Sequence, residues 1–267
     1  MSMLLSDRAF DVVAKAFHEV SGIKLTAAKR QLVIGRLQKL ANERGSSSLD
    51  DYVEAVIVKG DRDEMVKVVD RLTTNETYFF REPAHFEFLS QLLDGPKRSS
   101  APFRIWSAAS SSGEEAYSIA MLLADKIGRQ GWEIIGTDLS TAMVDAARKG
   151  LYPLERARDT RPDYLKRFCL KGSGPYDGQL LVHKDLRANV HFLQANLMRP
   201  LPELGEFDVV FLRNVLIYFD SQAKQDIVRR VTPFIRPGGY LFTGHSESLS
   251  SLDTGLRPIR PAIYARA

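Results

Sequence analysis

The chain has 267 residues, room for a large domain and a small one, and its 44% hydrophobic and 26% charged residues are typical of a soluble globular protein. No apolar run approaches the roughly 18 residues of a membrane span, and Met1 to Asp7 lack the features of a signal peptide. The net charge of +4 is too small to indicate a nucleic-acid-binding protein. The lone Cys169 excludes an internal disulfide and favours a cytoplasmic location. Its apolar context indicates packing rather than catalysis, and the five histidines show no metal-ligand spacing.

Residues 1–72 are predicted to form a small all-helical domain. Helical periodicity runs through residues 7–20, 27–42, 48–58 and 61–72, which are separated by glycines. Thr26 is a plausible N-cap of the second segment, and Gly45 its C-terminal glycine. Between Ser21 and Arg44 there are six basic residues and one acid, Glu43. This basic helix is either an ordinary solvated face or a docking surface for an acidic partner.

Residues 73–102 are predicted to form a linker that contributes to the site. Its first part, TTNETYFFRE (73–82), is unusually dense in polar and aromatic side chains. Ligand sites favour domain boundaries, so we expect this stretch to line the site. A helix over 85–93 and a loop over 94–102 follow.

Residues 103–267 alternate between strand and helix, which predicts a doubly wound α/β sheet. A strand at 103–106 leads through the small residues Ser107 to Gly113 into a helix at 114–126, and a second strand at 133–137 ends at Asp138. Bare N–H groups at such a turn can bind a nucleotide-like ligand, and an acid at Asp138 can hold ribose hydroxyls. Without a G-x-G-x-x-G fingerprint, the turn alone fits a ligand-free βαβ unit equally well.

The alternation breaks at Gly150. A helix at 163–168 and the glycine-rich turn KGSGPYDG (171–178) precede a β-prone run at 179–182, which predicts an antiparallel β-hairpin subdomain inserted at about residues 151–190. Strands at 190–194, 207–213, 239–242 and 262–265 and a helix at 222–234 complete the pattern, with a helix stop and turn at 236–239. The loops after these strands carry Asn196 and Asn214.

Motifs in this order resemble the CheR-type chemotaxis receptor glutamate O-methyltransferases, and the resemblance covers nearly the whole chain. The motifs are TTNETYFFRE (73–82), WSAASSSGEEAYSIA (106–120), GTDLS (136–140), the NL pair at 196–197, FLRNVLIYFD (211–220) and GGYLFTGHSES (238–248). The resemblance implies a Rossmann-like S-adenosylmethionine-dependent methyltransferase sheet. It also implies methyl transfer to glutamate carboxylates of chemoreceptors, which gives methyl esters and S-adenosylhomocysteine in sensory adaptation.

The resemblance also implies the roles of particular residues. It sets Arg81 and Tyr218 beside the reacting methyl, although Tyr218 could instead be a core residue. Glu114 and Glu115 could simply balance a helix dipole. The implied cofactor-binding residues are Asn75, Thr77, Arg81, Glu115, Asp138, Asn196, Leu197, Asn214 and Val215.

The implied partner is the cytoplasmic helical domain of a membrane chemoreceptor. The basic helix is its candidate docking surface, through Lys29, Arg30, Arg36 and Lys39. The inserted turn has the length of family members that bind a receptor C-terminal tail. The strand at 179–182, QLLV, lacks the basic residue expected there, so tail binding stays open.

Two other functions stay open. A nucleic-acid methyltransferase would share the cofactor fold, but neither an Asn/Asp-Pro-Pro-aromatic motif nor a Pro-Cys nucleophile occurs. A non-catalytic S-adenosylmethionine-binding adaptor is disfavoured by Asn75, Arg81, Asp138 and Tyr218. We therefore expect a catalytic protein with no nucleic-acid partner and no membrane insertion.

Overall fold

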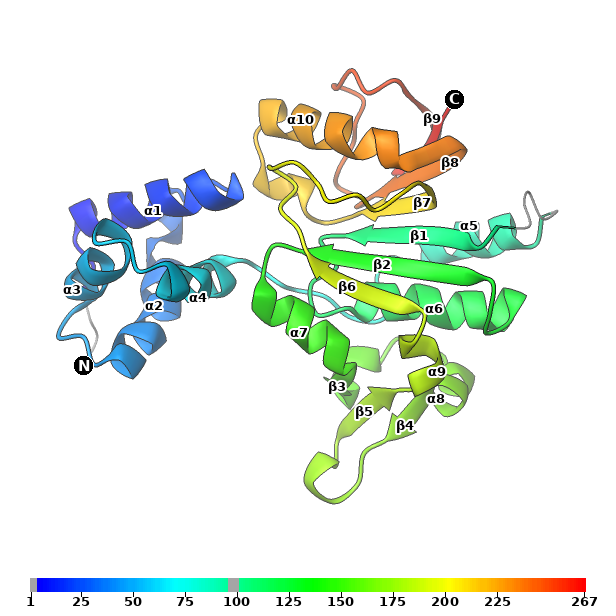
Figure 1. Ribbon diagram of the computed structural model, residues 1–267, viewed down its shortest axis with the longest axis horizontal. Helices are drawn as coiled ribbons and strands as arrows, with labels where there is room; N and C mark the ends of the chain where they lie inside the picture. The colour runs from blue at the N-terminus through cyan, green and yellow to red at the C-terminus, as the bar shows by residue number, and fades with distance from the viewer. Residues whose placement is uncertain (1–3, 96–100) are drawn as a thin grey trace. The chain divides into compact units, whose positions relative to one another are not determined.

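The chain, of which the computed structural model describes residues 4–95 and 101–267, divides into two compact units (Figure 1). One unit consists of Met1–Thr74 with Tyr218–Ala223, and the other of Asn75–Ile217 with Lys224–Ala267. The sequence-based limits of 1–72, 73–102 and 103–267 stay predictions. Two expectations extend outside the described residues: the signal-peptide assessment includes residues 1–3, and the loop at 94–102 includes 96–100.

The first unit is helical, as predicted. Its elements are α1 (Asp7–Ser21), η1 (Ala27–Lys29), α2 (Arg30–Arg44), α3 (Leu49–Val53), the π-turn η2 (Glu54–Val58) and α4 (Arg62–Leu72). The apolar stripe of α2, Val33, Leu37 and Leu40, is buried as its spacing predicts. The capping role predicted for Thr26 is wrong in detail, because its side chain makes no cap hydrogen bond and a 3-10 turn precedes α2.

The second unit is built on a mostly parallel sheet with strand order β6-β2-β1-β7-β8-β10-β9. The strands are β1 (Phe103–Ala108), β2 (Trp132–Asp138), β6 (Val190–Gln194), β7 (Phe207–Leu212), β8 (Ile235–Thr243), β9 (Leu256–Arg260) and β10 (Ile263–Arg266). β1 pairs in parallel with both β2 and β7, so the strand order reverses there. In an open α/β sheet a ligand binds at such a reversal, beyond the carboxyl ends of the strands.

Helices cover this sheet and complete its core. They are α5 (Pro83–Leu93), α6 (Glu114–Ile127), α7 (Thr141–Lys149) and α10 (Ser221–Val231), which continues into η6 (Thr232–Phe234). α6 packs against α5 and against β2, and most of its residues are buried. The predicted turn at 236–239 is instead an irregular part of β8, where the register against β7 shifts.

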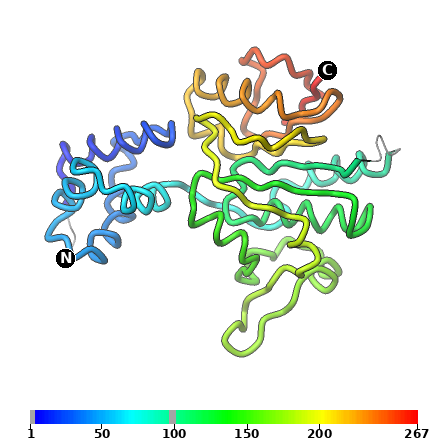
Figure 2. Tube along the Cα trace, in the orientation of Figure 1, coloured from blue at the N-terminus to red at the C-terminus, as the bar shows by residue number. Residues whose placement is uncertain are grey.

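The predicted insertion is present between α7 and β6, and Figure 2 follows the chain out of the sheet and back. Its antiparallel sheet has the order β3-β5-β4, with β3 (Leu151–Pro153), β4 (Cys169–Lys171) and β5 (Gln179–Val182). Between and after these strands lie η3 (Leu154–Ala157), α8 (Pro162–Phe168), η4 (Gly174–Tyr176) and α9 (Lys184–Arg187). Burial raises the pKa of the Cys169 thiol to about 12, in keeping with a packing role.

Among residues 4–95 and 101–267, no helix combines the length and the apolar character that a membrane crossing requires.

Candidate cofactor and active site

The turn after β1 is held against the end of β2. The N–H of Ser110 donates to the carbonyl of Thr137 at 2.8 Å, and the N–H of Ser111 donates to Oδ2 of Asp138 at 2.8 Å. Oδ1 of Asp138 accepts from the N–H of Ser140 at 2.9 Å. The buried Asp138 carboxylate therefore ties together the two loops between which a nucleotide-like ligand would bind.

Glu115, in the first turn of α6, belongs to a buried charge network. Its Oε1 accepts from the hydroxyl of Ser107 at 2.7 Å, and its Oε2 lies 2.7 Å from Nη1 of Arg213. The Arg213 side chain, which follows β7, is only 2% exposed. Its Nη2 donates to the carbonyl of Arg81 and lies 3.0 Å from Oε2 of Glu82. One guanidinium thus joins α6, the loop after β7 and the predicted linker.

A second set of contacts joins the linker to the loops after β7 and β8. Oε1 of Glu82 accepts from Nδ2 of Asn214 at 3.0 Å, and Oε2 of Glu247 accepts from the N–H groups of Asn214 and Gly244 at 2.7 Å each. Burial alone would raise the pKa of Glu82, but the hydrogen bond from Asn214 and the charge of Arg213 hold that pKa below its ordinary value. Glu82 is therefore ionised at neutral pH.

Backbone strain is concentrated in the same segments. Of the six non-glycine residues with positive φ in the described ranges, only Ala262 lies elsewhere. The others are Phe80 (φ 57°), Glu82 (60°), Ala109 (63°), Ser111 (49°) and Asn214 (56°). Such clustering is characteristic of functional sites, where surrounding contacts hold residues in costly conformations.

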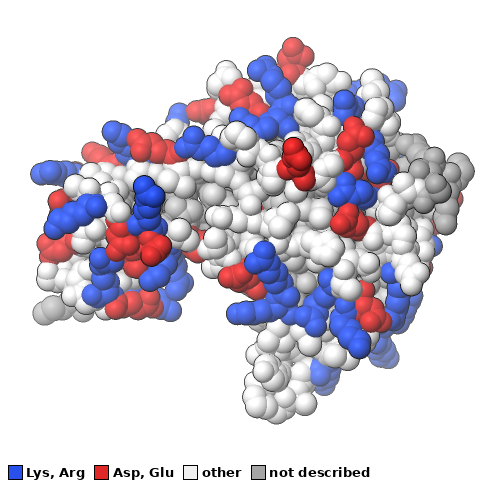
Figure 3. Space-filling view, viewed as in Figure 1, with Lys and Arg blue, Asp and Glu red and all other residues white. Residues whose placement is uncertain are grey.

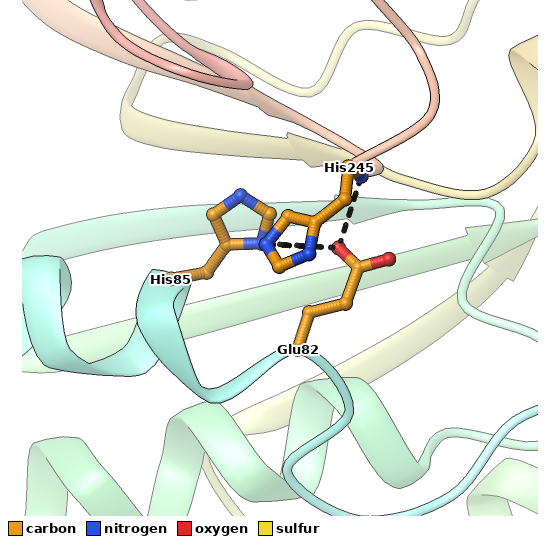
Figure 4. A group of neighbouring side chains, drawn as sticks. All are labelled: Glu82, His85 and His245. Carbon is orange, nitrogen blue, oxygen red and sulfur yellow. Dashed lines mark hydrogen bonds and ion pairs between the residues drawn. The ribbon is translucent and has the colours of Figure 1, made fainter.

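Glu82, His85 and His245 bring ligand-type atoms within 4.8 Å of one another (Figure 4). Oε2 of Glu82 lies 3.4 Å from Nδ1 of His85 and 3.9 Å from Nε2 of His245, and such a set can hold a zinc-type ion. The same Oε2 is already paired with Arg213, which supplies the positive charge that a metal would supply. We therefore assign the cluster to the charge network.

His85 is 1% exposed, and neither of its ring nitrogens has a hydrogen-bond partner among the described residues. Burial, with the nearby charge of Arg213, lowers its pKa to about 3. His85 is therefore neutral at physiological pH and acts as a packed ring in this network.

The remaining predicted cofactor residues occupy the linker and the loops after β6 and β7. The carbonyl of Asn75 accepts from the hydroxyl of Ser111 at 3.3 Å, and Thr77 is buried. Nη1 of Arg81 donates to the carbonyl of Glu76 at 2.8 Å. Oδ1 of Asn196 accepts from the N–H of Met198 at 2.9 Å. Leu197 is buried, and Val215 is half-buried beside Asn214.

Tyr218, the second predicted catalytic residue, is half-buried and belongs to the unit of the helices. Its place beside the methyl therefore stays a prediction. Three charged residues that the sequence did not single out stand inside motifs already identified: Arg213 and Glu247, which are buried, and Glu82, which is half-buried. The sequence signal for such residues is a charged residue next to an apolar run. A charge in that position becomes buried, and a buried charge needs a partner of opposite charge.

Several side chains of the basic helix make contacts within the helical unit and are not all available for a partner. Nη1 of Arg36 donates to the carbonyls of Leu72 at 2.7 Å and Thr73 at 2.9 Å, which stabilises the end of α4. Arg30 pairs with Asp7. The ammonium of Lys29 lies 5.7 Å from the ring centre of Tyr218. Lys39 lies 3.8 Å from Glu43 and is 63% exposed.

The strand order and the reversal at β1 define the Rossmann-like class of methyltransferase folds. Residues 75–264 match the family described as CheR methyltransferase, SAM binding domain, and residues 8–73 match CheR methyltransferase, all-alpha domain. The chain belongs to the CheR methyltransferase family. The predicted fold class and family are thereby confirmed.

Relatives with known names agree with this assignment. The chain is 36% identical over 266 residues to a chemotaxis protein methyltransferase of Escherichia coli (strain K12). The aligned region covers 98% of this chain and 92% of the relative. The chain is 38% identical over 282 residues to chemotaxis protein methyltransferase 1 of Pseudomonas aeruginosa, and that alignment covers 99% of this chain and 100% of the relative. It is 37% identical over 263 residues to chemotaxis protein methyltransferase 2 of the same species, which covers 97% and 92%.

The cofactor is S-adenosylmethionine, and the protein is a methyltransferase of the family whose reaction is glutamate O-methylation. The side chains at the reversal of the sheet fit that cofactor. Small residues line the turn after β1, and Asp138 at the end of β2 can accept from ribose hydroxyls. The amides of Asn75, Asn196 and Asn214 can both donate and accept, as adenine and an amino-acid group require.

Proposed function

We propose that the protein transfers a methyl group to glutamate side chains on the cytoplasmic helical domain of a chemoreceptor, and that it acts in the cytoplasm. The observation that carries the proposal is Asp138, whose carboxylate joins the loops after β1 and β2 at the reversal of a sheet that matches the family's cofactor-binding domain. The products are a glutamyl methyl ester and S-adenosylhomocysteine.

The chemistry requires no general base. An unperturbed glutamate has a pKa near 4.3, so the acceptor carboxylate is already ionised at neutral pH. When bound, S-adenosylmethionine supplies an electrophilic methyl group on a sulfonium. The transfer would join the acceptor oxygen to the methyl carbon and break the methyl–sulfur bond, whose electron pair would remain on sulfur. The negative charge of the carboxylate and the positive charge of the sulfonium would both be neutralised in this transfer. The protein therefore has to align the two groups and exclude water from them.

We assign Arg81 and Tyr218 to alignment at the methyl. An arginine held too close to the acceptor carboxylate would stabilise the ground state and slow the attack, so Arg81 acts by positioning. Its hydrogen bond to Glu76 and the contact of its carbonyl with Arg213 support a fixed position. The other proposed cofactor-binding residues are Asn75, Thr77, Glu115, Asp138, Asn196, Leu197, Asn214 and Val215.

We propose that the basic helix docks the acidic face of the receptor mainly through Lys39, whose side chain is 63% exposed. Arg36 contributes to the fold instead, through its contacts with the end of α4. Tail binding at the insertion stays a prediction. The face of the insertion seen in Figure 3 carries few charged side chains at its tip, which gives a carboxylate-bearing tail little to pair with.

The test is incubation of the full chain with methyl-labelled S-adenosylmethionine and receptor cytoplasmic fragments, scored by base-labile methanol release. Asp138→Ala should lose affinity for S-adenosylhomocysteine in calorimetry, whereas Asp145→Ala, an exposed acid on α7, should not. Label that is base-stable or recovered in nucleic acid would contradict the proposed reaction. Equal affinity in Asp138→Ala and wild type would contradict the proposed site.

A further inference from the structure

Arg156, at the end of η3 in the insertion, contacts the linker through both its backbone and its side chain. The N–H of Phe79 donates to the carbonyl of Arg156 at 3.0 Å. Nη1 of Arg156 donates to the carbonyl of Thr77. These contacts hold both ends of residues 77–79. The segment carries Thr77 and ends two positions before Arg81, and both are proposed cofactor residues.

The same guanidinium also faces the start of α6. Its Nη1 lies 3.9 Å from Oε1 of Glu114, whose side chain is buried. Oε2 of Glu114 accepts from the hydroxyl of Ser112 at 2.7 Å, in the turn after β1. Burial raises the pKa of Glu114, and the nearby charge of Arg156 acts in the opposite direction by favouring the ionised carboxylate. Arg156 therefore contacts the linker and Glu114, which is bound to the cofactor turn.

Tyr152, on β3 of the insertion, contacts the same two segments. Its hydroxyl donates to the carbonyl of Ser112 at 2.6 Å, and its ring packs edge to face on Phe79 with the ring centres 5.1 Å apart. A Cβ placed on Gly113, where φ is 94°, would lie 3.0 Å from the hydroxyl of Tyr152. The same Cβ would lie 2.8 Å from the Cβ of Ala147, so the positive φ and these close approaches together favour glycine in the turn.

We propose that Arg156 and Tyr152 are positioning residues of the cofactor site, so that the insertion holds the linker against the turn after β1. The inference rests on the cofactor site proposed above. It assigns the insertion a role distinct from receptor recognition. In this role Arg156 acts through its contacts with Thr77 and Glu114, and Tyr152 acts through its contacts with Ser112 and Phe79.

The test uses the full chain and two substitutions of Arg156, whose side chain is 39% exposed. Arg156→Met keeps the length of the stem and removes the charge and the donors, while Arg156→Lys keeps the charge and part of the donor set. Arg161→Met is the matched control, because Arg161 lies in the same insertion, is 66% exposed and pairs with Asp163. Tyr152→Phe removes the hydrogen bond to Ser112 and keeps the ring.

The readouts are calorimetric affinity for S-adenosylhomocysteine, KM for each substrate, kcat and the melting temperature. We expect Arg156→Met to weaken the affinity about tenfold, the effect of one charged hydrogen bond, and Arg156→Lys to recover part of it. KM for S-adenosylmethionine should rise, while KM for the receptor fragment and kcat at saturating cofactor stay near wild type. Tyr152→Phe should weaken the affinity in the same direction, and Arg161→Met should leave it unchanged.

Wild-type affinity in Arg156→Met would overturn the inference, as would an equal loss in Arg161→Met. A loss that tracks the melting temperature and is not recovered by lysine would overturn it too. If wild-type protein failed to bind S-adenosylhomocysteine, the proposed function itself would fail. If wild-type protein binds S-adenosylhomocysteine and the Arg156 and Tyr152 substitutions leave its affinity unchanged, only this inference fails and the proposed function stands.

Discussion

Arg213→Met should be among the most damaging single substitutions in the sheet unit. The side chain is 2% exposed, lies 2.7 Å from Glu115 and 3.0 Å from Glu82, and donates to the carbonyl of Arg81. Removal of the guanidinium leaves two largely buried carboxylates without their counter-charge. Breaking a buried ion pair in this way costs about 3 to 5 kcal/mol, and small domains have only about 5 to 15 kcal/mol of stability in total.

The assay is equilibrium urea unfolding together with calorimetry of S-adenosylhomocysteine binding. Arg213→Lys should recover little, because a single ammonium cannot contact Glu115, Glu82 and a carbonyl in a fixed plane. Arg129→Met is the control, since its pair with Asp185 is about half exposed and such surface pairs contribute at most about 1 kcal/mol. Adding Glu115→Gln to Arg213→Met should recover part of the loss, because one stranded charge is then neutral.

A loss of stability in Arg213→Met no larger than in Arg129→Met would refute the reasoning. So would a double variant, Arg213→Met with Glu115→Gln, that is less stable than Arg213→Met alone, since the stranded carboxylates would then not be the source of the cost.

Other predictions address the acceptor side, the basic helix and pH. Tyr218→Phe should lower kcat about tenfold in single-turnover transfer with unchanged cofactor affinity, whereas wild-type rates would return Tyr218 to a packing role. Lys39→Glu should raise KM for the receptor fragment without changing the melting temperature. Arg36→Glu should lower the melting temperature, because it removes the contacts with the end of α4. Equal melting temperatures in the two variants would contradict that role of Arg36. In the unfolded chain His85 takes up a proton below pH 6.5, whereas in the folded protein its pKa is lowered to about 3. The free energy of unfolding therefore decreases as the pH is lowered from 6.5 towards 3. From pH 6.5 to 5 this contributes a loss of about 1.5 kcal/mol that His85→Leu should lack in urea titrations, and equal slopes would contradict it.

The fold was predictable where the sequence pattern is local. Alternating apolar strands and amphipathic helices indicated the sheet, and the glycine-rich turn indicated the hairpin of the insertion. β9 (Leu256–Arg260) was missed because it is a mostly exposed edge strand that contains Pro258, and such strands lack an apolar pattern. β3 (Leu151–Pro153) was missed because it is short and its partner, β5, lies beyond three intervening helical segments and β4.

The site was predictable only in part, for a related reason. Asp138 could be identified because it ends a strand next to the central one, and the carboxyl ends of parallel strands share one edge of a sheet. The pairing of Arg213 with Glu115 and Glu82 could not, because 98 and 131 residues separate the partners. A sequence shows that a charge stands beside an apolar strand, but only the fold shows which carboxylate neutralises it.

The strained loops and the buried acids of this site explain each other. Each left-handed non-glycine residue costs about 1 to 3 kcal/mol and persists only where contacts determine its conformation. Ser111, at φ 49°, has its N–H bound by Asp138, and Asn214, at φ 56°, has its N–H bound by Glu247 and its side-chain amide bound by Glu82. A carboxylate can accept from several donors at once, so an acid is suited to hold such loops. The acids in these motifs therefore set the shape of the loops as well as their charge, and amide substitutions, which keep one acceptor oxygen, should be milder than alanine at Glu247 and at Asp138.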